Sequence, residues 1–85
     1  MKTRDDFLAK FMEKLGYIDN IKNFDHIRTE NKKEYERFQR IQLTGFASAA
    51  KEIGWIDDDE YLDLRIMAMD KNYKETLASL EENQR

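Results

Sequence analysis

The chain contains no cysteine and no proline, and only three of its 85 residues are glycine. Without cysteine it can form neither a disulfide nor a thiolate metal site, so its stability has to come from apolar burial. Few residues are suited to tight turns, which disfavours a turn-rich β fold. Charged residues make up 39% of the sequence, and together these features favour helices.

Long apolar runs are also absent. No stretch approaches the roughly 20 apolar residues that a membrane-spanning helix requires, so no membrane association is expected. Residues 1–6 are polar and lead into a helical pattern, which predicts no signal peptide and makes a cytoplasmic location the default expectation. The net charge of −3 gives no reason to expect non-specific attraction to nucleic acid or anionic lipid.

The remaining composition is that of a folded protein. Hydrophobic residues make up 40% of the chain and aromatic residues 12%, which argues against disorder. A length of 85 residues predicts one small domain covering residues 1–85. Within it, residues 81–85 are expected to fray because they are terminal and polar.

One short phrase occurs twice. Residues 15–19 read Leu-Gly-Tyr-Ile-Asp, and residues 53–57 read Ile-Gly-Trp-Ile-Asp. A glycine just after a helical pattern can adopt the left-handed conformation that ends a helix, so Gly16 and Gly54 are predicted C-terminal caps. Asp57 is the predicted N-cap of the next helix, because Glu60 follows at the spacing of a capping box.

Apolar residues recur at helical spacing on both sides of Gly54. The first stripe consists of Tyr35, Phe38, Ile41, Phe46, Ala49, Ala50 and Ile53. The second consists of Leu62, Ile66, Met69, Tyr73, Leu77 and Leu80. We therefore predict an all-α bundle with a long antiparallel helical hairpin (about 30–53 and 58–80), an N-terminal helix (about 4–15) and a short helical connector. A kink near residue 70 is the alternative to one continuous last helix.

Gly45 lies inside the predicted helix 30–53, where glycine costs about 1 kcal/mol relative to alanine. Close approach of another helix over Gly45, Ser48 and Ala49 would compensate for that cost. A tolerated surface glycine is the alternative interpretation.

No residue pattern predicts a catalytic, cofactor or metal site. His26 is the only histidine, and it has no nucleophile to activate. The acidic run 57–60 suggests a metal site, but Leu62 and Ala68 occupy the positions where a calcium loop needs glycine and glutamate. Acids at a helix N-terminus also stabilise the helix without an ion. An enzyme is not expected.

The leading hypothesis is a non-enzymatic protein-interaction module that presents a helical face to a protein partner. Phe11, Tyr61, Leu64 and Met67 are the predicted contact residues, because the last three make their helix apolar beyond its core stripe. The partner would be another protein or a second copy in a homodimer. Packing inside the chain is the default interpretation of the same apolar positions. Small accessory proteins of bacteria, phages and plasmids commonly share these features.

The alternative hypothesis is a nucleic-acid-binding or transcription-regulatory protein. Lys32, Lys33, Arg37 and Arg40 recur on one helix and could follow a phosphate backbone. Interleaved glutamates at ion-pair spacing and the acidic net charge make nucleic acid the less favoured partner.

Overall fold

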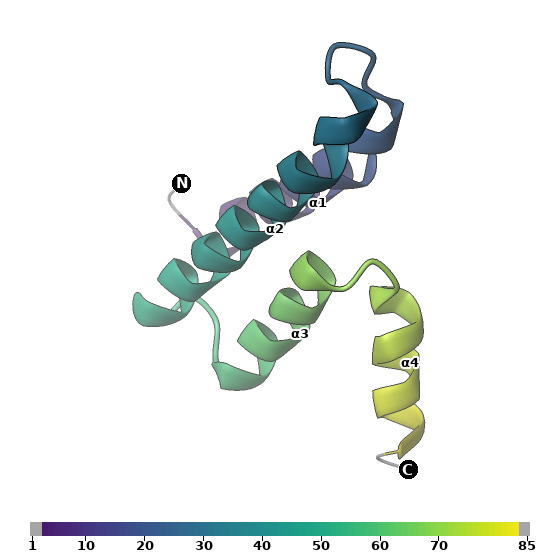
Figure 1. Ribbon diagram of the computed structural model, residues 1–85. Coiled ribbons are helices and arrows are strands. Elements are labelled where there is room, and N and C mark those ends of the chain that lie inside the picture. Colours follow the sequence, from purple (N-terminus) through teal and green to yellow (C-terminus); the bar gives the residue numbers. More distant parts are fainter. Residues whose placement is uncertain (1–2, 84–85) are drawn as a thin grey trace.

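A computed structural model describes residues 3–83 and confirms the all-α fold (Figure 1). Four α-helices and one short 3-10 helix make up this range, and it contains no strand. In chain order they are α1 (Arg4–Asp19), η1 (Ile21–Asn23), α2 (Thr29–Glu52), α3 (Asp58–Met69) and α4 (Tyr73–Asn83). Residues 81–83, which were predicted to fray, belong to α4, and residues 84–85 lie outside the described range.

The predicted hairpin is formed by α2 and α3, which run antiparallel on either side of Gly54. Gly54 has a φ of 84°, which confirms the predicted left-handed cap. Its amide donates to the carbonyl of Lys51, and the Trp55 amide donates to the carbonyl of Ala50. These two bonds form a Schellman motif, which satisfies carbonyls at the end of α2.

The predicted N-cap of α3 is also confirmed. The Asp57 carboxylate accepts from the Glu60 amide at 2.8 Å, and the Glu60 carboxylate accepts from the Asp57 amide at 3.3 Å. The two bonds complete a capping box. The turn therefore ends one helix and begins the next within a few residues.

The predicted cap at Gly16 is wrong, because α1 continues through Gly16 to Asp19. Continuation places Ile18 on the same side of the helix as Leu15 and Phe11, where it is buried. Burying such a side chain contributes about 1.5–3 kcal/mol, which exceeds the cost of about 1 kcal/mol for a glycine inside a helix. Asn20 ends the helix instead, and its amide donates to the carbonyls of Gly16 and Tyr17.

The predicted continuous last helix is also wrong, because α3 ends at Met69 and α4 begins at Tyr73. Asp70 has an extended backbone, and its carboxylate accepts from the Asn72 amide at 2.8 Å and the Thr76 hydroxyl at 2.5 Å. These local bonds offer the chain an alternative to helical hydrogen bonds. The predicted kink near residue 70 is in fact a complete break.

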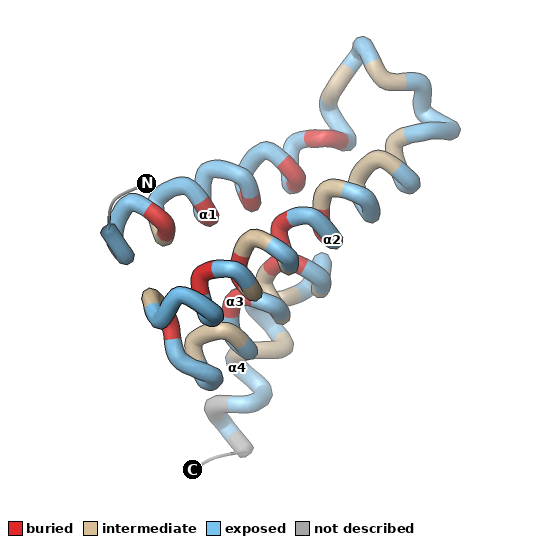
Figure 2. The backbone as a smooth tube through the Cα atoms, turned by 90° about the vertical axis from the view of Figure 1, so that its left-hand side faces the viewer, coloured by how far each residue is buried: buried red, intermediate tan, exposed pale blue. Residues whose placement is uncertain are grey.

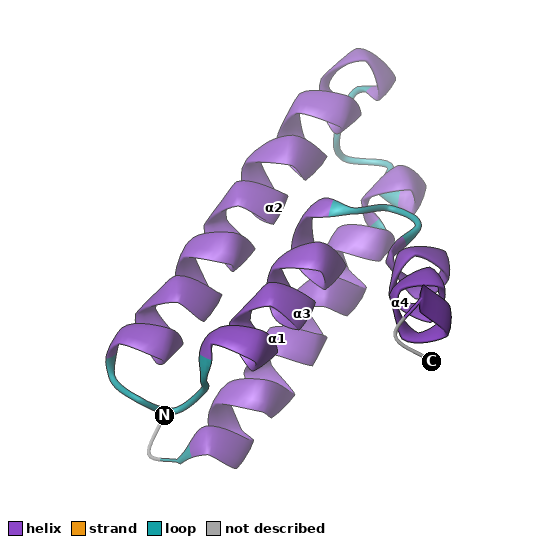
Figure 3. Ribbon diagram, turned by 90° about the horizontal axis from the view of Figure 1, so that it is seen from below, coloured by secondary structure: helices purple, strands orange, loops and turns teal. Residues whose placement is uncertain are grey.

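The core is formed where α1, α2 and α3 meet, and α4 lies beside α3 on the side away from α2 (Figures 1 and 3). Buried positions follow the inner sides of the three helices (Figure 2). The buried hydrophobic residues are Phe7, Phe11, Leu15, Ile18, Ile21, Leu43, Ala47, Ala50, Ile56, Leu64 and Ala68.

The predicted apolar stripes of the hairpin lie only partly on the buried side. Leu62 and Met69 are 51% and 47% exposed, whereas Leu64 and Ala68 are buried. On α2, Phe38 and Ile41 are 55% and 51% exposed. Of the other residues in that stripe, Ala50 is buried, and Tyr35 and Phe46 pack against the core, as predicted. Since α1 packs on one side of the hairpin, that side becomes the core, and the exposed members of the stripes lie on the other side.

Arg40 is buried at the junction of α1, α2 and α3. Its guanidinium donates to the carbonyl of Ala68 at 2.9 Å, near the end of α3. It also pairs with Glu36 at 3.3 Å and with Asp19 at 3.7 Å. A cation that satisfies a carbonyl at a helix C-terminus is stabilising, so Arg40 connects the ends of α1 and α3 to the middle of α2.

Candidate functional site

The structure does not bring the four predicted partner contacts to one surface. Phe11 is 0% exposed and Leu64 is 8% exposed, so both residues belong to the core. Tyr61 and Met67 are half-buried and pack against that core, and the Lys51 ammonium lies 5.0 Å from the centre of the Tyr61 ring. The predicted contact role is thus wrong for Phe11 and Leu64, because their side chains hold the three helices together.

The four basic residues of the alternative hypothesis do not form one exposed stripe either. Arg40 is buried, and the Lys32 ammonium donates to the carbonyl of Lys22 at 2.9 Å. Only Lys33 and Arg37 of the four are exposed. The structure therefore corrects the prediction for Arg40, which has a role in packing and helix capping.

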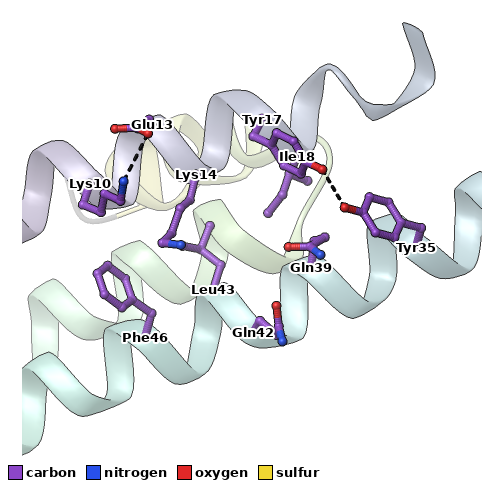
Figure 4. Close-up of a pocket in the computed structure, with 10 residues that line it drawn as sticks. All are labelled: Lys10, Glu13, Lys14, Tyr17, Ile18, Tyr35, Gln39, Gln42, Leu43 and Phe46. Atoms are coloured by element: carbon purple, nitrogen blue, oxygen red, sulfur yellow. Dashed lines mark hydrogen bonds and ion pairs between the residues drawn. The ribbon is translucent and has the colours of Figure 1, made fainter. Parts of the chain in front are cut away.

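A groove with a volume of about 850 Å³ lies between α1 and α2 (Figure 4). This volume falls within the range of binding pockets for small molecules and short peptide segments. Both helices contribute to its lining, which consists of Lys10, Glu13, Lys14, Tyr17, Ile18, Tyr35, Gln39, Gln42, Leu43 and Phe46.

The groove has an apolar base and one aromatic wall. Ile18 and Leu43 are buried beneath it and belong to the core. Phe46 is half-buried, with its ring 5.0 Å from the ring of Phe7. The Lys14 ammonium extends from α1 to 5.6 Å from the centre of the Phe46 ring, which places a cation over the apolar wall.

A pair of tyrosines joins the two helices at one end of the groove (Figure 4). The hydroxyl oxygens of Tyr17 and Tyr35 are 2.5 Å apart and share a hydrogen bond. This bond, together with partial desolvation and the nearby Tyr35 hydroxyl, raises the pKa of Tyr17 above its usual value of 10.0. The shared hydrogen bond holds the C-terminal end of α1 against α2.

Two glutamines on α2 lie along the groove, three residues apart. Neither the Gln39 nor the Gln42 amide has a hydrogen-bond partner in the described part of the chain. Each amide offers a carbonyl acceptor and an NH₂ donor. The groove thus combines an apolar base with polar groups that have hydrogen bonds to offer.

Positive charge exceeds negative charge along the groove. Lys10 pairs with Glu13 at 3.2 Å, which largely neutralises both groups. Lys14 has no ion-pair partner among residues 3–83, so its positive charge is left for a ligand. The local balance is one net positive charge within a chain whose net charge is −3.

Sequence reasoning missed this groove. No sequence pattern singles out Gln39, Gln42 or Lys14, and Tyr17 stands only within the repeated phrase at residues 15–19. The spacing of Tyr35, Gln39 and Gln42 at intervals of four and three does place them on one side of a helix. Their relation to α1 depends on how two helices pack, which spacing within one helix does not specify.

His26 and the acidic run 57–60, the other candidates from the sequence, make contacts within the chain. The imidazole of His26 is stacked on Phe24, with ring centres 5.3 Å apart. In the acidic run, Asp57 caps α3 and Asp58 pairs with Lys51 at 3.1 Å. Within residues 3–83 there is no cluster of three side chains able to hold a metal ion, and no helix in that range is both long and apolar enough to cross a membrane.

No protein-family model, curated protein or solved structure matches the chain.

Proposed function

We propose that this chain is a non-enzymatic protein-interaction module that binds a peptide segment of a protein partner in the groove between α1 and α2. The observation that carries the proposal is the pair of unpartnered amides, Gln39 and Gln42, above an apolar base. A pocket with mostly apolar walls and a few convergent polar groups is the usual form of a binding site.

The amides suit a peptide because a peptide backbone presents N–H and C=O groups in alternation. Gln39 and Gln42 are separated by three residues on a helix, so they span about one turn of the groove. Each could donate to one backbone carbonyl and accept from one backbone amide. Apolar side chains of the bound segment would then contact Phe46 and the surface over Leu43.

Charge favours an acidic segment. Lys14 is the unpaired cation of the groove, and it lies over the Phe46 ring, close to the apolar wall. A carboxylate next to an apolar residue in the bound segment would contact both groups at once. The nucleic-acid alternative has less support, because Arg40 and Lys32 already have partners within the chain.

Selection of peptides from a displayed random library tests the proposal. We expect enrichment of segments that combine an acidic residue with aromatic or aliphatic residues. Binding of a selected peptide should weaken by about threefold to tenfold in Lys14→Glu, because one partly exposed ion pair is replaced by repulsion. The double variant Gln39→Ala and Gln42→Ala should also weaken it.

Lys33→Glu is the matched control, because Lys33 is exposed on α2 outside the groove. It makes the same change in net charge and should leave peptide affinity unaltered. No enrichment, or binding that the three groove substitutions leave intact, would refute this site.

A further inference from the structure

Exposed apolar side chains gather on the side of the α2–α3 hairpin that faces away from α1, which lies behind α2 in Figure 1. We call this surface the outer face; it is made by Phe38, Ile41, Gly45, Leu62 and Met69. Residues two apart on a helix point to nearly opposite sides. Gly45 is two residues from Leu43 and Ala47, and Leu62 is two from Leu64, all of which are buried.

The outer face has the residue spacing of a buried helix seam. Phe38, Ile41 and Gly45 follow one another at intervals of three and four, and Leu62 and Met69 are seven apart. The four large side chains are nevertheless 47–55% exposed. Several large apolar side chains exposed on one side of a small domain are typical of an interaction surface.

The sizes of the side chains on α2 favour a second copy of the same chain as the occupant. Bulky residues, Phe38 and Ile41, lie on the N-terminal side of Gly45, and the small residue Ala49 lies on the C-terminal side. When two such helices cross antiparallel at Gly45, Ile41 of each copy falls opposite Ala49 of the other. Large side chains then pack over small ones at both symmetry-related contacts.

Gly45 supports the same crossing. A methyl group placed at Gly45 would meet no atom within 4 Å, so nothing within the chain requires a glycine there. Glycine inside a helix nevertheless costs about 1 kcal/mol. Close approach of two helix backbones at Gly45 of both copies would account for this residue.

The register of α3 fits the same two-fold axis. Two contacts align the helices: Lys51 pairs with Asp58, and Arg40 donates to the carbonyl of Ala68. Gly45 is about halfway between Arg40 and Lys51, so it lies level with the middle of α3. Leu62 and Met69 lie on either side of that level. A two-fold axis at the level of Gly45 places Leu62 of one copy opposite Arg65 of the other, about one helical turn from Met69.

Charge complementarity agrees with this arrangement. Arg37 and Glu52 are exposed and have no ion-pair partner in the part of the chain that the structure describes. Arg37 is eight residues before Gly45 and Glu52 is seven residues after it. The antiparallel crossing thus places Arg37 of each copy close to Glu52 of the other.

We propose that two copies of this chain associate through the outer face, with α2 packed on α2 and α3 on α3 about a two-fold axis at Gly45. The outer face is separate from the groove between α1 and α2, so dimer formation does not depend on the proposed peptide binding. Association through the outer face leaves the groove between α1 and α2 of each copy open on the outside of the dimer.

Light scattering on a dilution series tests the dimer. The expected mass of the wild type is twice the chain mass of 10.3 kDa. The Ile41→Glu protein should have the mass of one chain, and its helicity, measured by circular dichroism, should be unchanged. Met12→Glu, at an exposed position on α1, is the matched control and should remain dimeric. Ile41→Glu should also retain affinity for a groove-binding peptide. A wild-type monomer at all concentrations, or a dimer of Ile41→Glu, would overturn the proposal.

Cross-linking tests the antiparallel register, because the chain has no cysteine of its own. An equimolar mixture of Ile41→Cys and Ala49→Cys proteins should form a disulfide-linked heterodimer under mild oxidation. A mixture of Met12→Cys and Ala49→Cys proteins should give a yield of disulfide-linked heterodimer that is at least tenfold lower. Equal yields in the two mixtures would contradict the crossing at Gly45, and a preferred homodimer of Ile41→Cys would indicate a parallel pairing.

Discussion

At the scale of single residues, the two copies of the repeated phrase show how a residue's surroundings determine its conformation. Gly16 is helical and Gly54 is left-handed, although each is followed by an aromatic residue, an isoleucine and an aspartate. Glu60 completes a capping box with Asp57, whereas Lys22 occupies the equivalent position after Asp19. A new α-helix therefore begins directly after the second copy, whereas only the short η1 follows the first.

Alanine substitution should have opposite effects at the two glycines. Gly54→Ala should lower the free energy of unfolding by about 1 kcal/mol or more, because alanine is strained at a φ of 84°. Gly16→Ala should raise it by about 0.5–1 kcal/mol, because alanine favours helix and the added methyl group meets no atom within 4 Å. Denaturant unfolding of both variants beside the wild type measures the difference, and equal effects would refute this account.

Arg40 illustrates the limit of sequence patterns at this scale. Among alternating glutamates and lysines it resembles any other charge on a solvated helix face. Its guanidinium is buried only because the end of α3 returns to it and presents the carbonyl of Ala68. The long side chain allows the charge to reach groups on two other helices, Asp19 and Ala68.

At the scale of elements, the break between α3 and α4 depends on Asp70. The hydrogen bond from the Thr76 hydroxyl, the bond from the Asn72 amide and the nearby charge of Arg40 lower the pKa of Asp70 below its usual 3.8. The ionised carboxylate is thus the form that stabilises the junction. An aspartate two residues before an asparagine is a local turn signal that competes with the helical spacing of Leu62, Ile66 and Met69.

The lowered pKa predicts acid-sensitive stability. Because the pKa of Asp70 is lower in the folded chain, its contribution is fully present above the usual pKa of 3.8 and is lost as the pH falls through the folded value. Unfolding free energies measured from about pH 5 down to about pH 2 should decrease accordingly. Asp70→Asn removes this titration, so its stability should vary less with pH than that of the wild type. Identical pH profiles would rule out the contribution.

At the scale of the whole molecule, α1, α2 and α3 form the core and α4 adds little to it. All of the core residues lie between Phe7 and Ala68, and α4 contacts α3 beyond them. Tyr73 is the α4 residue that packs against the core, and Leu80 is 42% exposed. The three-helix unit therefore contains the interactions that define the fold.

A chain shortened to residues 1–72 should consequently remain folded. The loss of the Tyr73 contact and of the hydrogen bond between Thr76 and Asp70 should lower the free energy of unfolding by about 1–2 kcal/mol, because the described residues of α4 include no fully buried core residue. Thermal unfolding followed by circular dichroism shows whether the shortened chain unfolds cooperatively and how much stability it has lost. A non-cooperative transition in the shortened chain would show that α4 is needed for the core.

The sequence by itself determined the class of the fold and the central turn, because helix periodicity, the left-handed glycine and the capping box are local properties. It did not determine which side of the hairpin is buried, since α3 is apolar on both sides and only the packing of α1 selects Leu64 over Leu62. The groove could not be predicted from the sequence either, because Lys14 and Gln39 lie on two helices that only the packing of α1 on α2 brings together. Burial of Ile18, Arg40 and their neighbours is a property of three helices at once, and only the tertiary structure decides it.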